Sequence, residues 1–85
     1  MTVKETLINM LIERGMFLSQ ANEVMELAVP QLNDLVEGYS ISLDSRSDEY
    51  PKEIYKALFA CIRPIALKWI DDNKPQAWYR DVFVD

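Results

Sequence analysis

Residues 51–73, PKEIYKALFACIRPIALKWIDDN, decide the fold of this 85-residue chain. Pro51 suits the first position of a helix, and Asn73-Lys74-Pro75 forms a stop signal at its end. Pro64 removes one internal hydrogen bond and so predicts a bend. Apolar side chains cover well over half of the helix circumference: Ile54, Tyr55, Leu58, Phe59, Cys61, Ile62, Ile65, Ala66, Trp69 and Ile70. We therefore expect this helix at the centre of the molecule.

A first helix is predicted over residues 2–14. Thr2 followed by Glu5 matches a capping box, and Gly15 supplies the left-handed residue that commonly ends a helix. The apolar residues recur at three- and four-residue spacing: Val3, Leu7, Ile8, Leu11 and Ile12. After the turn, Met16 and Phe17 are expected to point inward.

A second helix is predicted over residues 19–37, with Ser19 as its N-cap. Its apolar stripe continues in phase across Pro30: Ala21, Met25, Ala28, Leu32, Leu35 and Tyr39. Because proline costs a helix interior about 3 kcal/mol, a break at Val29 competes with a bend. The preserved phase favours a bent helix.

The remaining segments are predicted to be a loop and a short tail. Turn-forming residues fill 44–48, and Ile41 and Leu43 could attach this loop to the core. The alternation over 39–43 suits a strand, but no second strand is available to pair with it. The prediction is an all-α single domain, residues 1–85, of three main helices (about 2–14, 19–37 and 51–73), bent at Pro30 and Pro64, plus a C-terminal turn and aromatic tail from Pro75 to Phe83.

Composition narrows the function classes. The formal net charge is −5, and residues 19–50 hold seven acids against Arg46 alone. This charge disfavours binding to nucleic acid or to an anionic membrane, and leaves a basic protein partner open. The single cysteine excludes an internal disulfide and indicates a reducing compartment, and the absence of histidine removes the usual zinc ligand and the usual general base. Because no run approaches about 20 apolar residues, we expect a cytoplasmic protein.

No catalytic, cofactor-binding or metal-binding residue is predicted, and we do not expect an enzyme. The chain has no glycine-rich phosphate loop, CxxC pair, HExxH or G-x-S-x-G motif. Cys61 lies in an apolar run, where burial would suppress its thiolate, so we interpret it as a core residue. Asp71-Asp72 is interpreted as a solvated helix end, because adjacent helical residues point about 100° apart.

The acids of the second helix form one candidate protein-binding surface. Glu23, Glu26, Asp34 and Glu37 keep a common helical phase opposite the apolar stripe. They could face a basic protein surface or imitate a row of phosphates. The alternative is an ordinary solvated face, which every amphipathic helix needs.

The C-terminal aromatic segment is a second candidate, with Trp78, Tyr79 and Arg80 as its possible binding residues. Exposed aromatic residues anchor many interfaces, but they more often close a core. Their spacing lets Trp78 and Phe83 fold back on Trp69, within one chain or across a dimer. Arg80 could bind Asp71 or Asp72, or a helix C-terminus.

Several short motifs also carry a resemblance. They are Arg14-Gly15-Met16-Phe17, Tyr50-Pro51, Trp69-Ile70, Asn73, Pro75, Ala77-Trp78-Tyr79-Arg80 and Phe83. In these the chain resembles a group of small uncharacterised proteins encoded by tailed phages and prophages. The resemblance spans nearly the whole chain and implies a bacterial cytoplasm, but it brings no activity and no catalytic residues.

We therefore expect an accessory protein that binds another protein. The alternatives are a phosphate-mimicking inhibitor of a DNA-binding protein, a structural or assembly subunit and, least favoured, an enzyme. A homodimer is also predicted, because the apolar arc of residues 51–73 looks wider than two short helices can cover. The competing expectation is a compact monomer in which Val82, Phe83 and Val84 act as a lid.

Overall fold

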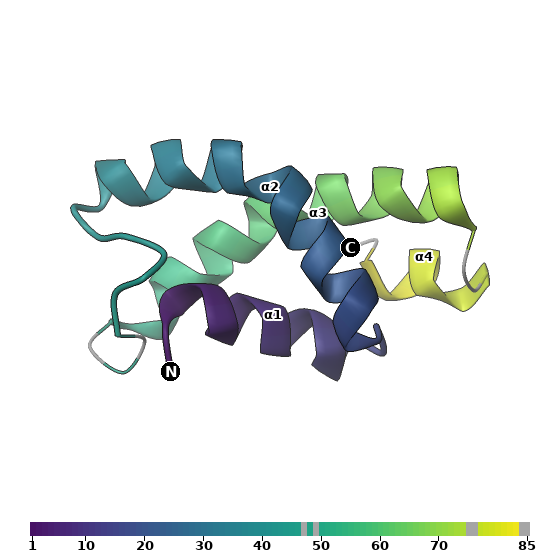
Figure 1. Cartoon of the computed structure of the whole chain (residues 1–85), viewed down its shortest axis with the longest axis horizontal. Coiled ribbons are helices and arrows are strands. Elements are labelled where there is room, and N and C mark those ends of the chain that lie inside the picture. Colours follow the sequence, from purple (N-terminus) through teal and green to yellow (C-terminus); the bar gives the residue numbers. More distant parts are fainter. Residues whose placement is uncertain (47, 49, 75–76, 84–85) are drawn as a thin grey trace.

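The computed structural model describes residues 1–46, 48, 50–74 and 77–83, with the backbone alone of Ala77 and Trp78. Within these ranges the chain forms four helices and no strand. They are α1 (Val3–Glu13), α2 (Leu18–Gly38), α3 (Lys52–Asn73) and α4 (Ala77–Phe83) (Figure 1). The all-α prediction is confirmed, and the segment predicted as a turn and tail contains the short helix α4.

The ends of α1 follow the sequence signals. The Thr2 hydroxyl accepts a hydrogen bond from the Glu5 amide, and the Glu5 carboxylate accepts one from the Thr2 amide, both at 3.1 Å. At the other end Gly15 has φ 109°, a conformation that glycine adopts at little cost. The predicted capping box and the glycine stop are both confirmed.

The start of α2 differs from the prediction. The N-cap position belongs to Phe17, not Ser19, and the Gln20 side chain accepts from the Phe17 amide at 3.0 Å. Gln20 thus binds the free backbone donor ahead of the helix, which leaves Ser19 inside the first turn. Met16 is buried as predicted, but Phe17 is 67% exposed. Its backbone is extended (φ −74°, ψ 157°), and successive side chains on an extended backbone point to opposite sides.

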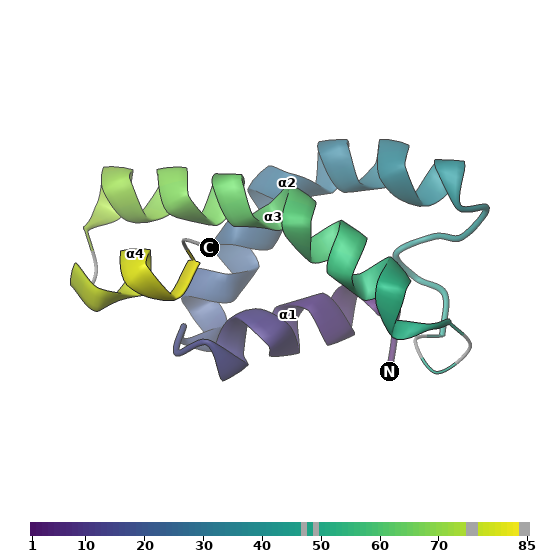
Figure 2. The same cartoon turned by 180° about the vertical axis from the view of Figure 1, so that it is seen from behind.

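Both long helices bend, as predicted. Figure 1 shows the change of direction in α2 and Figure 2 that in α3. Pro30 and Pro64 lie inside these helices on exposed positions, where each ring pushes against the carbonyl of the preceding turn. Each helix therefore curves around the core, with its proline on the outer side.

The inner stripe of α2 is only partly as predicted. Ala21, Met25, Ala28 and Leu32 are buried, but Leu35 is half-buried and Tyr39 is exposed. Val24 and Val36 are buried instead, so the inward-facing side moves round the helix relative to a straight one.

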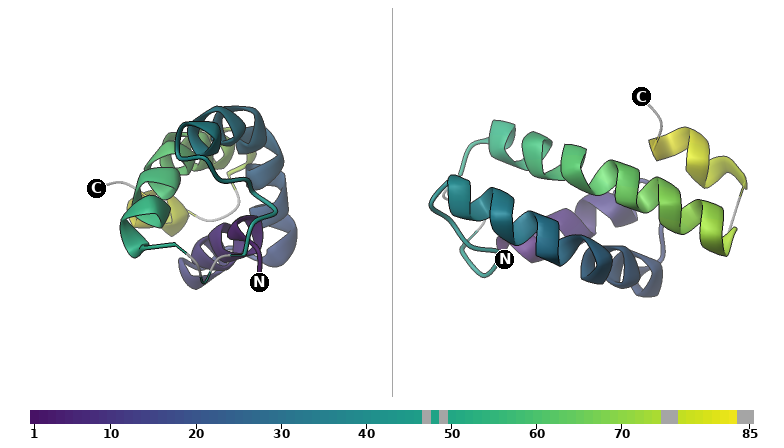
Figure 3. Two further views of the ribbon diagram at one scale, coloured as in Figure 1. Left: turned by 90° about the vertical axis from the view of Figure 1, so that its left-hand side faces the viewer. Right: turned by 90° about the horizontal axis from the view of Figure 1, so that it is seen from above.

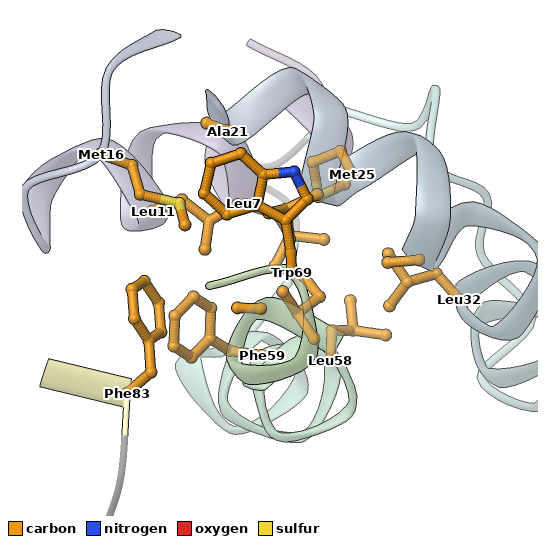
Figure 4. Packing of buried hydrophobic residues seen from close by; sticks show 14 of the residues in the cluster. Leu7, Leu11, Met16, Ala21, Met25, Leu32, Leu58, Phe59, Trp69 and Phe83 are labelled. Carbon is orange, nitrogen blue, oxygen red and sulfur yellow. The ribbon is translucent and has the colours of Figure 1, made fainter. Parts of the chain in front are cut away.

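The core lies between α2 and α3, which make the most extensive contact, with α1 and α4 against them. Figure 3 shows the helices arranged around one axis, and Figure 4 shows the side chains that fill the space between them. Tyr55, Phe59, Ile62 and Trp69 are all buried within the single chain. These are four of the side chains that suggested a dimer. Of the predicted lid, Phe83 is buried and Val82 packs against the core, whereas Val84 lies outside the described residues.

The loop between α2 and α3 binds the free backbone amides at the start of α1. Leu43 is buried and Ile41 packs against the core, as predicted. The Leu43 carbonyl accepts a hydrogen bond from the Lys4 amide at 3.0 Å. The Ser45 carbonyl accepts one from the Val3 amide at 2.9 Å. These amides lie in the first turn of α1, where no carbonyl of the helix can reach them. The loop therefore serves as a cap.

Candidate functional site

The site is built on the antiparallel pair α2 and α3, which run side by side in Figure 3. Trp69 donates its indole N–H to a Glu23 carboxylate oxygen at 3.1 Å, and the Cys61 thiol lies 3.8 Å from the Gln31 amide oxygen. Between these two contacts the chain advances eight residues along α2, from Glu23 to Gln31, and goes back eight residues along α3, from Trp69 to Cys61. This register places Leu27 opposite Ile65.

A groove runs along this pair. One hollow, of about 460 Å³, is lined by Leu27, Gln31, Pro64, Ile65, Lys68, Trp69, Asp72 and Asn73. A neighbouring hollow, of about 310 Å³, is lined by Glu23, Glu26, Leu27, Trp69 and Asn73. The shared lining residues Leu27, Trp69 and Asn73 make the two hollows one continuous surface. We call it the α2/α3 groove.

The groove joins an apolar floor to a charged end. Leu27 is 57% exposed, and Trp69 lies beneath the surface with its polar edge bound to Glu23. Three carboxylates line the groove near the start of α2 and the end of α3, those of Glu23, Glu26 and Asp72, while Lys68 supplies an ammonium group. The opposite end, at Gln31 and Pro64, is uncharged.

The four acids predicted as a binding surface are all exposed. Glu23 and Glu26 line the groove, whereas Asp34 and Glu37 lie farther along α2, outside its lining. Glu23 also has a structural partner in Trp69, which the helical phase of the acids did not predict. The predicted stripe therefore divides into a groove half and a half outside the groove.

The C-terminal candidates have structural roles where the structure describes them. Tyr79 is buried and donates its hydroxyl to the Gly15 carbonyl at 2.8 Å, with the Gln20 side-chain oxygen at 3.2 Å. Arg80 pairs with Asp71 at 2.6 Å, one of the two predicted acids. The side chain of Trp78 lies outside the described residues.

Arg14 and Phe83 complete this corner, which we call the α4 corner. The Arg14 guanidinium donates to the Val82 carbonyl at 2.9 Å and lies 4.6 Å from the centre of the Phe59 ring. The Phe83 ring stacks on Phe59, not on Trp69 as predicted, with centroids 6.3 Å apart (Figure 4). Motifs from both ends of the chain therefore meet at one place.

Cys61 is half-buried at the edge of the core, less enclosed than predicted. Burial raises the pKa of its thiol, which lowers the fraction of reactive thiolate at neutral pH. The described residues contain no cluster of three or more metal-ligating side chains.

The sequence alone did not predict the groove, because its central residue, Leu27, is a single apolar residue among polar ones on its side of the helix. Leu27 lies on the side of α2 that carries Glu23 and Glu26, where a single apolar residue is unremarkable in a sequence. The available signal was its combination with Ile65 and Trp69, which requires the register of two helices to be known.

The comparisons with known proteins add no assignment. No significant match is found among protein-family models, curated proteins or solved structures. Of the helices in the described ranges, none combines the length and the apolar character needed to cross a membrane.

Proposed function

We propose that this chain is a non-enzymatic accessory protein of the kind encoded by phages and prophages, and that it binds another protein in the bacterial cytoplasm. The observation that supports this most is the α2/α3 groove. Its floor exposes Leu27 beside a buried tryptophan, and polar side chains surround it. An apolar centre with a polar rim is the usual arrangement of a protein-binding surface.

The groove also has a suitable size. Hollows of about 460 and 310 Å³ fall within or near the range of small binding sites. Such a surface can accept one or two large side chains of a partner, which is where binding energy concentrates.

Leu27→Glu tests the proposal, with Leu18→Glu as a matched control. Both leucines belong to α2, and their exposed fractions are 57% and 59%, but only Leu27 lines the groove. A partner captured from bacterial lysate by the unaltered protein should be lost with Leu27→Glu and retained with Leu18→Glu. Circular dichroism verifies that both variants fold. Equal capture by both variants would contradict the proposal.

The phosphate-mimicking inhibitor is the sharper alternative, favoured by the exposure of Glu26, Asp34 and Glu37 on one face. Charge reversal at all four predicted acids should abolish capture of a DNA-binding protein only if the row of carboxylates is the binding surface. Reversal at Asp34 and Glu37 alone discriminates further, because these two lie outside the groove lining.

A homodimer or assembly subunit is the remaining alternative, and a second copy would then cover the groove. Light scattering across micromolar concentrations tests it. A monomer mass at every concentration argues against self-association, whereas a dimer mass that Leu27→Glu abolishes would place the groove at the subunit interface.

A further inference from the structure

We infer that the α2/α3 groove binds a cationic amphipathic segment of a partner protein, with a large apolar side chain over Leu27 and Trp69 and an arginine or lysine beside Glu23 and Glu26. This inference rests on the proposed function and specifies its partner by chemistry. The observation that supports the inference is the separation of apolar and acidic groups along the groove.

The length of the groove limits the segment. Glu23 and Gln31 mark its two ends on α2, and eight residues at about 1.5 Å each give roughly 12 Å. Two turns of a partner helix span this distance. A helix in a groove places its anchors three, four and seven residues apart, so about two anchors would contact the floor.

The charges give the segment a direction. Glu23, Glu26 and Asp72 lie toward one end of the groove, and Lys68 is the cation in its lining. The Glu23–Trp69 hydrogen bond fixes one of these carboxylates beside the floor. A carboxylate offers about four acceptor positions, and the indole N–H uses one of them. A guanidinium or ammonium group therefore finds acceptors at this end, while the uncharged end suits apolar or amide side chains.

The charges around the groove also favour a positively charged partner. Asp71, next to Asp72, has its charge paired with Arg80, so Arg80 is already used on the neighbouring surface. Asp34 and Glu37 continue the negative potential along α2. An acidic segment would be repelled by the acids that line the groove and by Asp34 and Glu37 beyond its uncharged end, whereas a cationic segment would be attracted.

Synthetic peptides of about 12 residues test the inference directly. The probe carries two apolar anchors four residues apart and two arginines at one end, and its counterpart carries glutamates in place of the arginines. Binding is followed through the fluorescence of Trp69 in the 85-residue chain with Trp78→Phe. We expect the arginine peptide to bind more weakly as salt rises, and the glutamate peptide to bind at least ten-fold more weakly at low salt.

Two matched charge reversals localise the binding. Glu26→Lys and Glu37→Lys change the net charge equally, on the same helix, at two exposed positions, but only Glu26 lines the groove. Glu26→Lys should weaken the arginine peptide about three- to ten-fold, whereas Glu37→Lys should change it less than two-fold.

The possible outcomes separate this inference from the proposed function. Equal effects of the two reversals, or equal binding of the two peptides, would overturn the inference. The Leu27→Glu and Leu18→Glu pair decides the proposed function independently. If Leu27→Glu abolishes capture while peptide charge has no effect, the groove binds a partner of different chemistry; if Leu27→Glu leaves capture intact, the proposed function itself fails.

Discussion

The helix α3 contributes to two regions, the α4 corner and the α2/α3 groove. In each region an aromatic side chain donates a hydrogen bond to another element, but the first region is covered and the second is open. At the α4 corner, the Tyr79 hydroxyl crosses to the turn between α1 and α2, and the Phe83 ring covers Phe59. In the α2/α3 groove, the Trp69 indole N–H crosses to Glu23, but no other helix in the described part of the chain covers Leu27 and Ile65 as fully. One short helix makes the difference between a closed surface and an open one.

The comparison separates side chains that stabilise the fold from one that the fold leaves exposed. Burial of apolar area stabilises the fold by about 25 cal/mol per Å², so the side chains under α4 contribute to folding. Leu27 is 57% exposed and therefore contributes little to the stability of the fold. Substitutions in the two regions should therefore affect different properties.

The largest expected effect is that of Phe83→Ala. Phe83 is fully buried and stacks on Phe59, so the loss should lower the free energy of unfolding by about 3 kcal/mol. Leu27→Ala in the groove should cost less than about 0.5 kcal/mol because the side chain is largely exposed. Urea unfolding of both variants measures the contrast. Similar losses in the two would show that the groove is as important for folding as the α4 corner.

Tyr79→Phe should have the next largest effect, about 1 to 2 kcal/mol. The substitution keeps the ring but removes the hydroxyl that donates to the Gly15 carbonyl. The matched control is Tyr39→Phe, at an exposed tyrosine, which should leave the urea midpoint nearly unchanged. A small effect at Tyr79 would mean that water replaces the lost donor.

The fold could largely be predicted because its signals are local. The capping box at Thr2, the stop at Gly15 and the prolines of the two long helices each act within a few residues, so the sequence alone shows them. The predicted start of α2 was wrong because Phe17, not Ser19, is the N-cap, and the Gln20 side chain accepts a hydrogen bond from the Phe17 amide. Propensity ranks serine higher, but the geometry of the turn after Gly15 decides the outcome.

The candidate site could be predicted only in part because it depends on register between helices. The exposure of Glu23 and Glu26 follows from helical phase, whereas their position beside Trp69 follows from the pairing of α2 with α3. A pairing of Arg80 with Asp71 was one of the alternatives that the sequence suggested, because the two residues are only nine positions apart. The roles of Arg14 and Tyr79 join residues more than 60 positions apart, which no local pattern reveals.

A smaller effect is expected from Arg80→Gln at the edge of the α4 corner. Its partner Asp71 lies at 2.6 Å, but the two side chains are 51% and 56% exposed. Solvent and salt screen such a pair, so the loss should be about 0.2 to 1 kcal/mol and should shrink as salt is added. A double-mutant cycle with Asp71→Asn isolates the interaction. A coupling well above 1 kcal/mol would show that the pair fixes the position of α4.

The smallest expected effect is the pH dependence that Glu5 contributes at the start of α1, remote from both regions. The hydrogen bonds from Thr2, first that of its backbone amide, hold the pKa of Glu5 below its usual value of 4.5. The unfolded chain therefore takes up the proton first as the pH falls. The resulting stability is present above about pH 4.5 and is lost as the pH falls through the lower, folded pKa.

Glu5→Gln removes this contribution while keeping an oxygen that can accept from the Thr2 amide. The fall in urea midpoint between pH 7 and pH 3 should be smaller in the variant than in the unaltered protein. Glu53→Gln provides the control, because Glu53 also lies in the first turn of its helix, where the N-cap Pro51 makes no side-chain hydrogen bond. If the two substitutions change the pH dependence equally, the field of the helix end is responsible and the capping box is not.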